Sequence, residues 1–241
     1  MKIRSMSVFL LVCLAAAAWA QTADELVARN LAGRGGAEKL RAVKTMVMTG
    51  TISFGDASSP ISVKAWRPNQ IREEFTVQGT EITRAYDGTV GWQIQKIGEK
   101  SKVEVLSGGN ADNIREEAEN AIEGPLLDYA KKGSKVAALG KDTWSGKPVY
   151  KLKITTHMET SITEFLDATT YLEIHEEIER TVDGKLMTIV EDVGDYREVG
   201  GIKFAHKFVS GPKENPQAST LQIEKMALDA PVDAGVFVMP K

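Results

Sequence analysis

Hydrophobic and polar residues alternate along most of the chain from Thr45 onward. A period of two is typical of β-strands that have one buried face and one face in water. The alternating apolar positions are Met46, Met48, Ile52, Phe54, Ile61, Val63 and Ala65 in the first half, and Tyr150, Leu152, Ile154, Leu172, Ile174, Ile178, Ile202, Phe204 and Phe208 in the second half. Turn-forming pairs separate these runs, and the stretch from Ser161 to Phe208 is predicted to be a meander of antiparallel strands.

Helical patterns stand before the strands and in the middle of the chain. Thr22 and Glu25 have the spacing of a capping box, which predicts a helix from Thr22 to the glycines at 33, 35 and 36. A second short helix is predicted from about Ala37 to Val43. These two helices form a short N-terminal pair.

The third helical pattern, from Asn110 to Lys132, interrupts the strands. Its apolar residues recur at intervals of four, at Ile114, Ala118, Ile122, Leu126 and Ala130. Gly124-Pro125 is predicted to break this helix into two pieces. A broken amphipathic helix among strands would lie as a lid across the open mouth or face of the sheet. The periodicity alone favours an ordinary covering helix.

The first twenty residues have the features of a secretory signal peptide. Lys2 and Arg4 precede an apolar run, and Ala18-Trp19-Ala20 forms a small-x-small cleavage site before Gln21. The apolar run is shorter than the roughly 20 residues of a membrane span. Acylation of Cys13 would instead make a lipoprotein, but Val12 stands where a small residue is expected. We therefore predict residues 1–20 as a cleaved signal and the periplasm as the destination.

Composition limits the partners of the mature chain. Loss of residues 1–20 removes two cations and no acid, so the formal net charge changes from −3 to −5. A mild acidic excess without a basic tract argues against nucleic acid and against docking on an anionic membrane surface. Cys13 is the only cysteine, so the mature chain is expected to fold without a disulfide. Residues 21–241 are predicted to form a single β domain.

No catalytic motif is found in the sequence. It contains no G-x-S-x-G elbow, no glycine-rich phosphate loop and no mature cysteine nucleophile. His175 begins H-E-E-I-E, which lacks the second histidine of a metal-binding H-E-x-x-H motif. On a regular strand His175 would share a face with Glu173, Glu177 and Glu179, and we predict that this face is solvated. We predict a protein that is not an enzyme and that holds neither a cofactor nor a metal.

Two stretches join predicted strands, Trp66-Arg67-Pro68-Asn69-Gln70-Ile71-Arg72 and Tyr86-Asp87-Gly88-Thr89-Val90-Gly91-Trp92. Together with the phrases at 195–204 and 230–237, they resemble the periplasmic lipoprotein-carrier family, which is LolA/LolB-like. The resemblance covers nearly the whole mature chain. It implies a mainly β protein in which a single antiparallel sheet curls into an unclosed β-barrel with a helical lid. Members of that family hold acyl chains inside the barrel.

The resemblance also implies site residues. In the family, the arginine of the Arg-Pro turn bonds to the lid and governs its opening, and Arg67 matches that position. Ile71 and Glu73 stand where the family has cavity aromatics, so binding of triacylated lipoproteins in particular is not implied. Apolar, adaptable side chains would line a lipid cleft. The predicted ligand-binding residues are Arg67, Ile71, Met46, Met48, Phe75, Trp92 and Ile114.

Three hypotheses about function follow. The first is an exported, monomeric periplasmic protein that binds lipid or an acylated lipoprotein in a hydrophobic half-barrel, with outer-membrane lipoprotein sorting as its role and an inner- or outer-membrane protein as a further partner. The second is an envelope sensor or scaffold with the same fold and a filled core. The third is a periplasmic hydrolase that uses Glu73 or His206.

Overall fold

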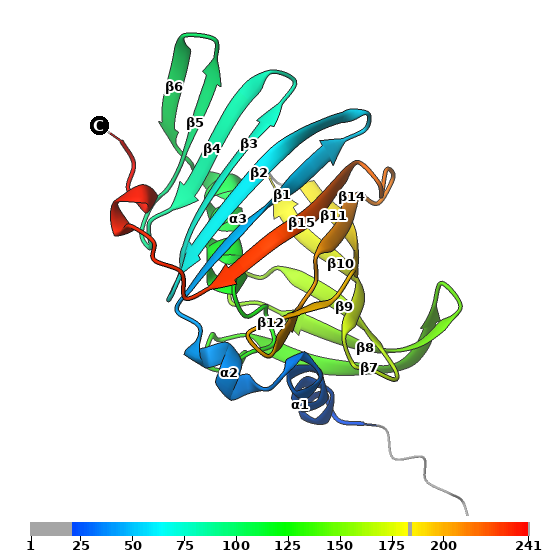
Figure 1. Ribbon diagram of the computed structural model, residues 1–241. Helices are drawn as coiled ribbons and strands as arrows, with labels where there is room; N and C mark the ends of the chain where they lie inside the picture. The colour runs from blue at the N-terminus through cyan, green and yellow to red at the C-terminus, as the bar shows by residue number, and fades with distance from the viewer. Residues whose placement is uncertain (1–20, 183–184, 241) are drawn as a thin grey trace, which may run out of the picture.

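The computed structural model describes residues 21–182 and 185–240, so the predicted signal peptide at 1–20 lies outside the described residues. The main element is one antiparallel sheet of 13 strands, in the order β6-β5-β4-β3-β2-β1-β15-β14-β11-β10-β9-β8-β7. The sheet curves strongly (Figure 1). Its two edge strands, β6 and β7, do not pair with each other in the described part of the chain. The predicted unclosed barrel is therefore confirmed.

The strands follow the alternating runs of the sequence. The first half of the sheet consists of β1 (Thr45–Phe54), β2 (Ala57–Trp66), β3 (Gln70–Val77), β4 (Thr80–Tyr86), β5 (Gly91–Ile97) and β6 (Lys100–Val105). The second half consists of β7 (Lys135–Trp144), β8 (Lys147–Thr155), β9 (Ser161–Asp167), β10 (Glu173–Val182), β11 (Lys185–Gly194), β14 (Lys207–Pro212) and β15 (Ser219–Leu228).

The two halves join where β1 pairs with β15. The register shifts by one residue between Thr49 and Gly50, which is a β-bulge. A Cβ on Gly50 would lie 2.0 Å from the Gln222 carbonyl oxygen, so only glycine fits this close approach. Bulges bend the strand that carries them, and this one lies at the joint between the two halves.

The run from Ile202 to Phe208 is not one strand, contrary to the continuous meander that we predicted. β13 (Ile202–Phe204) pairs with β12 (Arg197–Val199) in a separate two-stranded sheet, and β14 begins only at Lys207. Gly200 and Gly201 both have left-handed backbone conformations, with φ of 61° and 75°. They form the turn that the Gly200-Gly201 pair predicts, whereas the break between Phe204 and Lys207 is not revealed by the period-two pattern.

The N-terminal helix pair is confirmed. α1 (Ala23–Arg34) begins with the predicted capping box, in which Thr22 Oγ1 accepts from the Glu25 amide and Glu25 accepts from the Thr22 amide. It ends at Gly35, whose φ is 119° and whose absent Cβ would lie 2.3 Å from the Gly201 carbonyl oxygen. α2 (Ala37–Ala42) follows directly.

The central helix is shorter than predicted. α3 (Gly108–Asn120) ends four residues before Gly124, and residues 121–133 form turns, so the expected second helical piece is wrong. Gly124 and Asp128 have φ of 78° and 53°, which an α-helix excludes. α3 contacts β3, β4 and β5 as well as β10 across the curve, and it lies inside the bend of the sheet (Figure 1). We refer to residues 108–133 as the lid segment.

Two apolar clusters hold this arrangement together. One joins the helix pair, the end of the lid segment and the second half of the sheet, and includes Leu40, Met46, Leu127, Leu152 and Phe204. The other joins α3 to the first half, and includes Ile61, Val63, Ile71, Tyr86 and Ile114. Among the described residues, no helix is long and apolar enough to cross a membrane.

Candidate ligand-binding site

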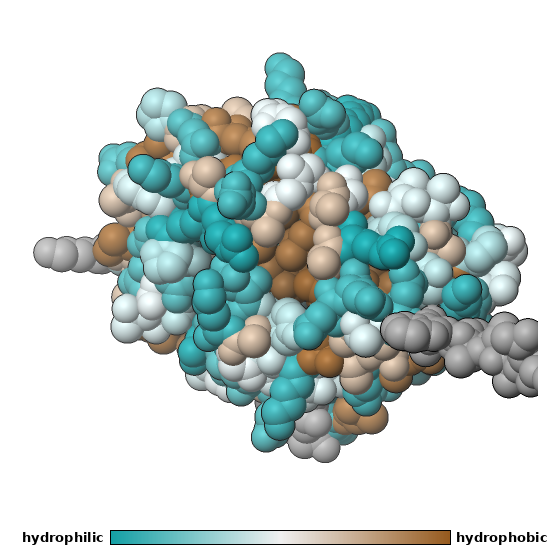
Figure 2. All heavy atoms as spheres, turned by 90° about the horizontal axis from the view of Figure 1, so that it is seen from below, coloured by the Kyte–Doolittle hydropathy of each residue, from teal (hydrophilic) through white to brown (hydrophobic). Residues whose placement is uncertain are grey.

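A cavity of about 390 Å³ lies between the lid segment and the sheet. Both apolar clusters contribute to its walls. Its apolar lining consists of Met46, Met48, Ile61, Val63, Ile71, Ala121, Ile122, Pro125, Leu126, Val193, Phe204, Ala205, Phe208, Leu221, Ile223 and Met226. The volume falls in the range of about 300–1,000 Å³ that is usual for small-molecule sites. Seen from below, apolar side chains at the centre of the molecule are ringed by hydrophilic ones (Figure 2).

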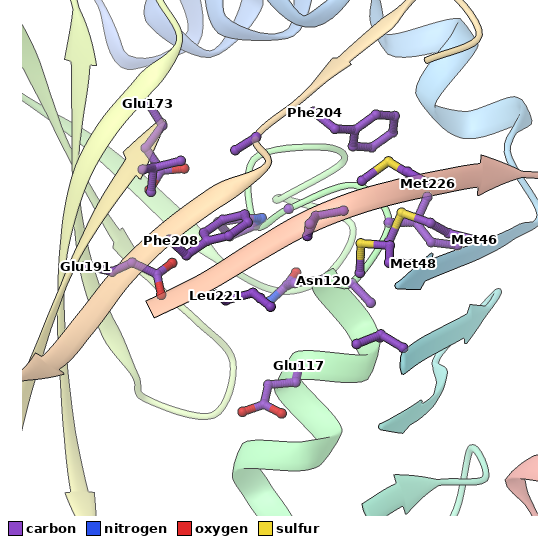
Figure 3. A pocket seen from close by; sticks show the side chains of 18 of the residues that line it. Met46, Met48, Glu117, Asn120, Glu173, Glu191, Phe204, Phe208, Leu221 and Met226 are labelled. Carbon is purple, nitrogen blue, oxygen red and sulfur yellow. The ribbon is translucent and has the colours of Figure 1, made fainter. Parts of the chain in front are cut away.

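Strand register explains how one wall becomes rich in methionine. Met48 lies opposite Met226 on β15 and opposite Val63 on β2, and Met46 lies two residues away on the same face. Met46, Met48 and Met226 form what we call the methionine wall, which occupies one end of the cavity in Figure 3. Unbranched thioether side chains adapt to ligands of irregular shape.

The structure brings some of the predicted site residues together and separates others. Met46, Met48 and Ile71 line the cavity. Phe75 packs beside Ile61 and Val63, and Ile114 is completely buried in the same cluster, so these two support the wall without lining it.

Trp92 does not line the cavity. It is completely buried on the opposite face of the sheet, where its Nε1 donates to the Phe237 carbonyl oxygen at 2.7 Å. Phe237 belongs to the short 3₁₀ helix η1 (Ala234–Phe237) of the C-terminal segment. Gly91 faces the interior instead, and a Cβ there would lie 2.7 Å from Ile114 Cγ2. Both faces of β5 are covered, so the alternation alone assigned Trp92 to the wrong side.

Arg67 lies outside the cavity, between the sheet, α2 and the lid segment. Its Nε donates to the Val43 carbonyl oxygen at 2.6 Å, and its Nη2 donates to the Leu40 carbonyl oxygen at 2.8 Å. Its guanidinium also pairs with the buried carboxylate of Glu123 in the lid segment. Lys132 Nζ lies 2.7 Å from the other oxygen of Glu123, and burial together with the nearby Arg67 lowers the pKa of Lys132 to about 8. Arg67 thus makes the lid contact that the resemblance implies, while its control of opening remains a prediction.

The strand β10 differs from the regular strand that we predicted. Its pairing with β9 shifts by one residue between Glu173 and His175. The bulge turns Glu173 to the inner face. His175 lies on the outer face, as predicted, but it is only 3% exposed and stacks on Trp144 at a ring distance of 3.8 Å. The prediction of a solvated face is therefore wrong for His175, which is buried, and for Glu173, which turns inward, whereas Glu179 is exposed as predicted.

Four glutamates face the interior of the second half, and only Glu173 owes this position to the bulge. Glu176 lies directly opposite Glu164 on β9 and Glu191 on β11, and Glu173 precedes the bulge. We call Glu164, Glu173, Glu176 and Glu191 the carboxyl cluster. Glu164, Glu173 and Glu191 line the cavity. Sequence reasoning missed this cluster, because alternating glutamates are usually assigned to water.

Burial dominates the protonation of the carboxyl cluster. It raises the pKa of Glu164 and of Glu191 to about 8 and that of Glu176 to about 7. The pKa of Glu173 is also raised, first by burial and then by the neighbouring carboxyls. Two of these carboxyls have an arginine near them, Glu164 close to Arg34 and Glu176 close to Arg180.

A second acidic group in the cavity is fully paired. Glu73 lies where the resemblance places a family aromatic, and its carboxylate bonds to Arg84. Arg84 Nη2 also lies 2.8 Å from Glu117 Oε2 in α3. Burial raises the pKa of Glu117 to about 7 in spite of this arginine. The described residues contain no group of three or more His, Cys, Asp or Glu side chains that could hold a metal ion.

Comparison with known proteins identifies the fold. No family model and no curated protein matches the chain. A domain from Vibrio parahaemolyticus that is named for outer membrane lipoprotein sorting matches with a TM-score of 0.55 and 11% identity, over 88% of this chain and 97% of that one. A LolA superfamily protein from Nitrosomonas europaea matches with a TM-score of 0.57 and 12% identity, over 91% and 98%.

A DUF1329 family protein from Desulfovibrio piger is similar to the same degree, with a TM-score of 0.54 and 12% identity over 88% of this chain and 95% of that one. Sequence identities this low show a similar fold and nothing about function. The chain therefore has a LolA-like fold, and the predicted resemblance is confirmed at the level of the fold.

Proposed function

We propose that this protein binds a lipid or an acylated protein non-covalently in the cavity beneath its lid segment, and that it does so in the periplasm. The observation that carries the proposal is the cavity of about 390 Å³ with a wall of methionine and aliphatic side chains. Protein interiors are normally close-packed, with few voids larger than a water molecule. An apolar space of this size beneath an unclosed sheet favours a binding site over a filled core.

Energetics support an alkyl or acyl chain as the ligand. Burying one methylene group gains about 0.8 kcal/mol, so a chain of roughly 16 carbons would gain on the order of 12 kcal/mol if it were fully buried. Association and ordering of the chain subtract several kcal/mol from this gain. The remainder is enough for specific binding, and no cofactor or chemical step is needed.

Release of the ligand is proposed to follow from movement of the lid segment. The bonds from Arg67 to Val43, Leu40 and Glu123 hold this segment against the helix pair and the β2–β3 turn. Opening would break the Arg67–Glu123 ion pair. A role in outer-membrane lipoprotein sorting, with a membrane protein as donor or acceptor, is the form of this function that the fold favours.

Two observations argue against the hydrolase hypothesis. Glu73 is engaged by Arg84, and His206 is buried with its Nδ1 2.9 Å from the Phe204 carbonyl oxygen. Neither side chain is free to act on a substrate, so we propose binding without catalysis. The sensor or scaffold hypothesis requires a filled core, which the cavity disfavours.

Binding of Nile red, an uncharged dye that fluoresces in apolar surroundings, tests this proposal. The wild-type protein is expected to bind the dye saturably and to release it when a long-chain amphiphile is added. Met48→Trp places a larger side chain inside the cavity and should abolish binding. Met187→Trp makes the same change at an exposed position of β11 and should leave binding intact. Absence of saturable binding, or equal binding by both variants, would overturn the proposal.

A further inference from the structure

The two ends of the cavity differ in chemistry. The methionine wall occupies one end, and Glu173 and Glu191 project from the other side, with Phe208 and Leu221 between them (Figure 3). An apolar surface with a polar group at one end is complementary to an amphiphile, whose tail and head are recognised separately. The polar end therefore determines which class of head group fits.

Glu164 is the best-defined group at that end. Its side chain lines the cavity although the residue is only 2% exposed. Its Oε2 accepts no hydrogen bond from any described residue, and the same holds for Glu173 Oε1. A buried polar atom without a partner costs about 1–3 kcal/mol. These unpaired oxygens point to a ligand that brings hydrogen-bond donors.

The cations of the second half do not satisfy these oxygens. Arg34 lines the cavity, but its Nη1 donates to the Glu123 carbonyl oxygen in the lid segment at 2.5 Å. Arg180 bonds to the side-chain oxygen of Asn113 in α3. In contrast, Glu73 and Glu117 at the first half share Arg84. The carboxyl cluster thus has acceptor capacity that the protein leaves unused.

We infer that the cavity selects amphiphiles with an amine head group, whose ammonium lies among Glu164, Glu173 and Glu191 and whose apolar tail lies against the methionine wall. This inference rests on the proposed function and specifies its ligand class. An ammonium has three donors and no acceptor, which matches a set of carboxylate oxygens. Bonds between an ammonium and a carboxylate are charge-assisted and are among the stronger hydrogen bonds.

The charge of the site disfavours the other common head groups. A fatty-acid carboxylate or a phosphate would be repelled by any carboxyl of the cluster that is ionised, and its binding would require the cluster to keep its protons, whereas an ammonium favours their loss. An alcohol could bond to one carboxyl but would not balance its charge. The selectivity should therefore decrease from amine to alcohol to acid.

Proton release should accompany binding of an amine. The raised pKa values of the carboxyl cluster leave it partly protonated near neutral pH, and a nearby ammonium favours the ionised form. The charged and titratable groups near the cluster are Arg34 on α1, Glu116 and Glu117 on α3, Arg180 on β10 and Tyr196, together with Lys203 on β13 and Glu73 on β3, which line the same cavity. Asp192 is adjacent to Glu191 in the chain but bonds to His175 on the outer face. Ammonium binding is thus expected to displace protons that the cluster holds in the free protein.

A set of three ligands with the same tail tests the inference. Dodecylamine, dodecanol and dodecanoic acid are each titrated against the complex with Nile red at neutral pH, below their aggregation thresholds. Dodecylamine is expected to displace the dye at about a tenfold lower concentration than dodecanol, and dodecanoic acid is expected to be the weakest. If all three are equal, or if the acid is strongest, the inference is wrong while the proposed function stands. If none displaces the dye, the proposed function itself fails.

Isosteric variants test whether the carboxyl cluster causes the preference for amine head groups. Glu164→Gln and Glu191→Gln each remove one ionisable group and keep the shape of the side chain, so both should weaken the binding of dodecylamine more than that of dodecanol and reduce the preference for the amine severalfold. Glu179→Gln makes the same change at an exposed position of β10 and serves as the control. Calorimetric titrations with dodecylamine in two buffers of different ionisation enthalpy should show proton release by the wild type and less by Glu164→Gln. An unchanged preference in both cluster variants would contradict the inference, even if one of them is unstable.

Discussion

The two halves of the curved sheet face the same cavity, but they place different side chains on it. The first half, with β15, contributes the methionine wall and aliphatic residues, and its one acid, Glu73, is paired with Arg84. The second half contributes the carboxyl cluster, where buried oxygens have no partner. The comparison teaches that the inner face of an unclosed barrel is not simply its hydrophobic face. On our proposal, the first half with β15 supplies most of the apolar binding surface, and the carboxyl cluster of the second half discriminates between head groups.

The largest expected effect is a loss of stability when a residue in the packed core of the first half, away from the cavity, is truncated. Trp92 is completely buried and donates to the Phe237 carbonyl oxygen. Trp92→Ala should lower the free energy of unfolding by about 3–5 kcal/mol, which is the usual cost for a large aromatic in a core. Denaturant titration measures this cost. A loss below about 1 kcal/mol would mean that the C-terminal segment does not pack on this face.

A smaller difference is expected between two neighbours in the methionine wall. Met46 is 2% exposed and also belongs to the apolar core, so Met46→Ala should cost about 2–5 kcal/mol. Met48 borders the empty space and already lacks neighbours on one side, so Met48→Ala should cost only about 1 kcal/mol. The same denaturant titration compares them. Equal, large losses would indicate that the space around Met48 is filled, which the sensor or scaffold hypothesis requires.

The buried carboxyl cluster of the second half should make the free energy of unfolding depend on pH. Burial raises the pKa of Glu164 and Glu191 to about 8 and that of Glu176 to about 7, from an ordinary value of 4.5. In the unfolded chain these carboxyls lose their protons near pH 4.5, whereas the folded chain holds them until pH 7–8. The stabilisation that these protonated carboxyls give to the folded state is therefore fully present below about pH 4.5, and it is lost as the pH rises to about 8.

Melting temperature measures this dependence. It should fall by several degrees between about pH 5 and about pH 8, since each kcal/mol shifts the midpoint by roughly 2–4 °C in a protein of this size. Asp128, whose pKa is lowered to about 2 by its bond to Arg41, changes only in more acidic solution. Glu164→Gln should flatten the profile and Glu179→Gln should not. A wild-type melting temperature that rises across this interval would contradict the burial of the cluster.

The smallest expected effect is on the rate at which the lid segment releases a bound ligand. Arg67→Gln removes the ion pair with Glu123 and should increase the dissociation rate of Nile red severalfold, while its equilibrium binding changes less. Stopped-flow dilution measures the rate. Arg72→Gln is a matched control, because Arg72 bonds to the Val236 carbonyl oxygen and to Glu74, away from the cavity. Equal rates in the two variants would indicate that Arg67 holds the fold together but does not gate the site.

Much of the fold could be predicted from local patterns. The period-two runs locate most strands, the capping box at Thr22 locates α1, and the Arg67-Pro68 turn predicts the β2–β3 connection. Met46, Met48 and Ile71 are in phase on one face, so their common place in the cavity follows from alternation. These features depend on residues close together in the chain.

The errors share a different physical origin. The predicted place of Trp92 in the cavity is wrong because alternation shows that a residue is buried but not on which side, and the C-terminal segment that covers the outer face is remote in sequence. The sequence does not predict the carboxyl cluster, because a buried glutamate without a partner is rare and charge normally predicts exposure. For Glu173, a bulge before His175 also moves the side chain to the inner face. Such features depend on tertiary contacts and on function, and a local pattern carries neither.

Mass spectrometry of organic extracts tests the central claim most directly. The chain of 241 residues, with its predicted signal peptide, is expressed in a bacterial host, purified from the periplasmic fraction without detergent, and extracted next to Met48→Trp and Met187→Trp. The account predicts an amphiphile with a long apolar chain in near-stoichiometric amount from the wild type and from Met187→Trp, and little from Met48→Trp. Wild-type extracts with no more lipid than those of Met48→Trp would contradict the claim that the cavity holds a hydrophobic ligand.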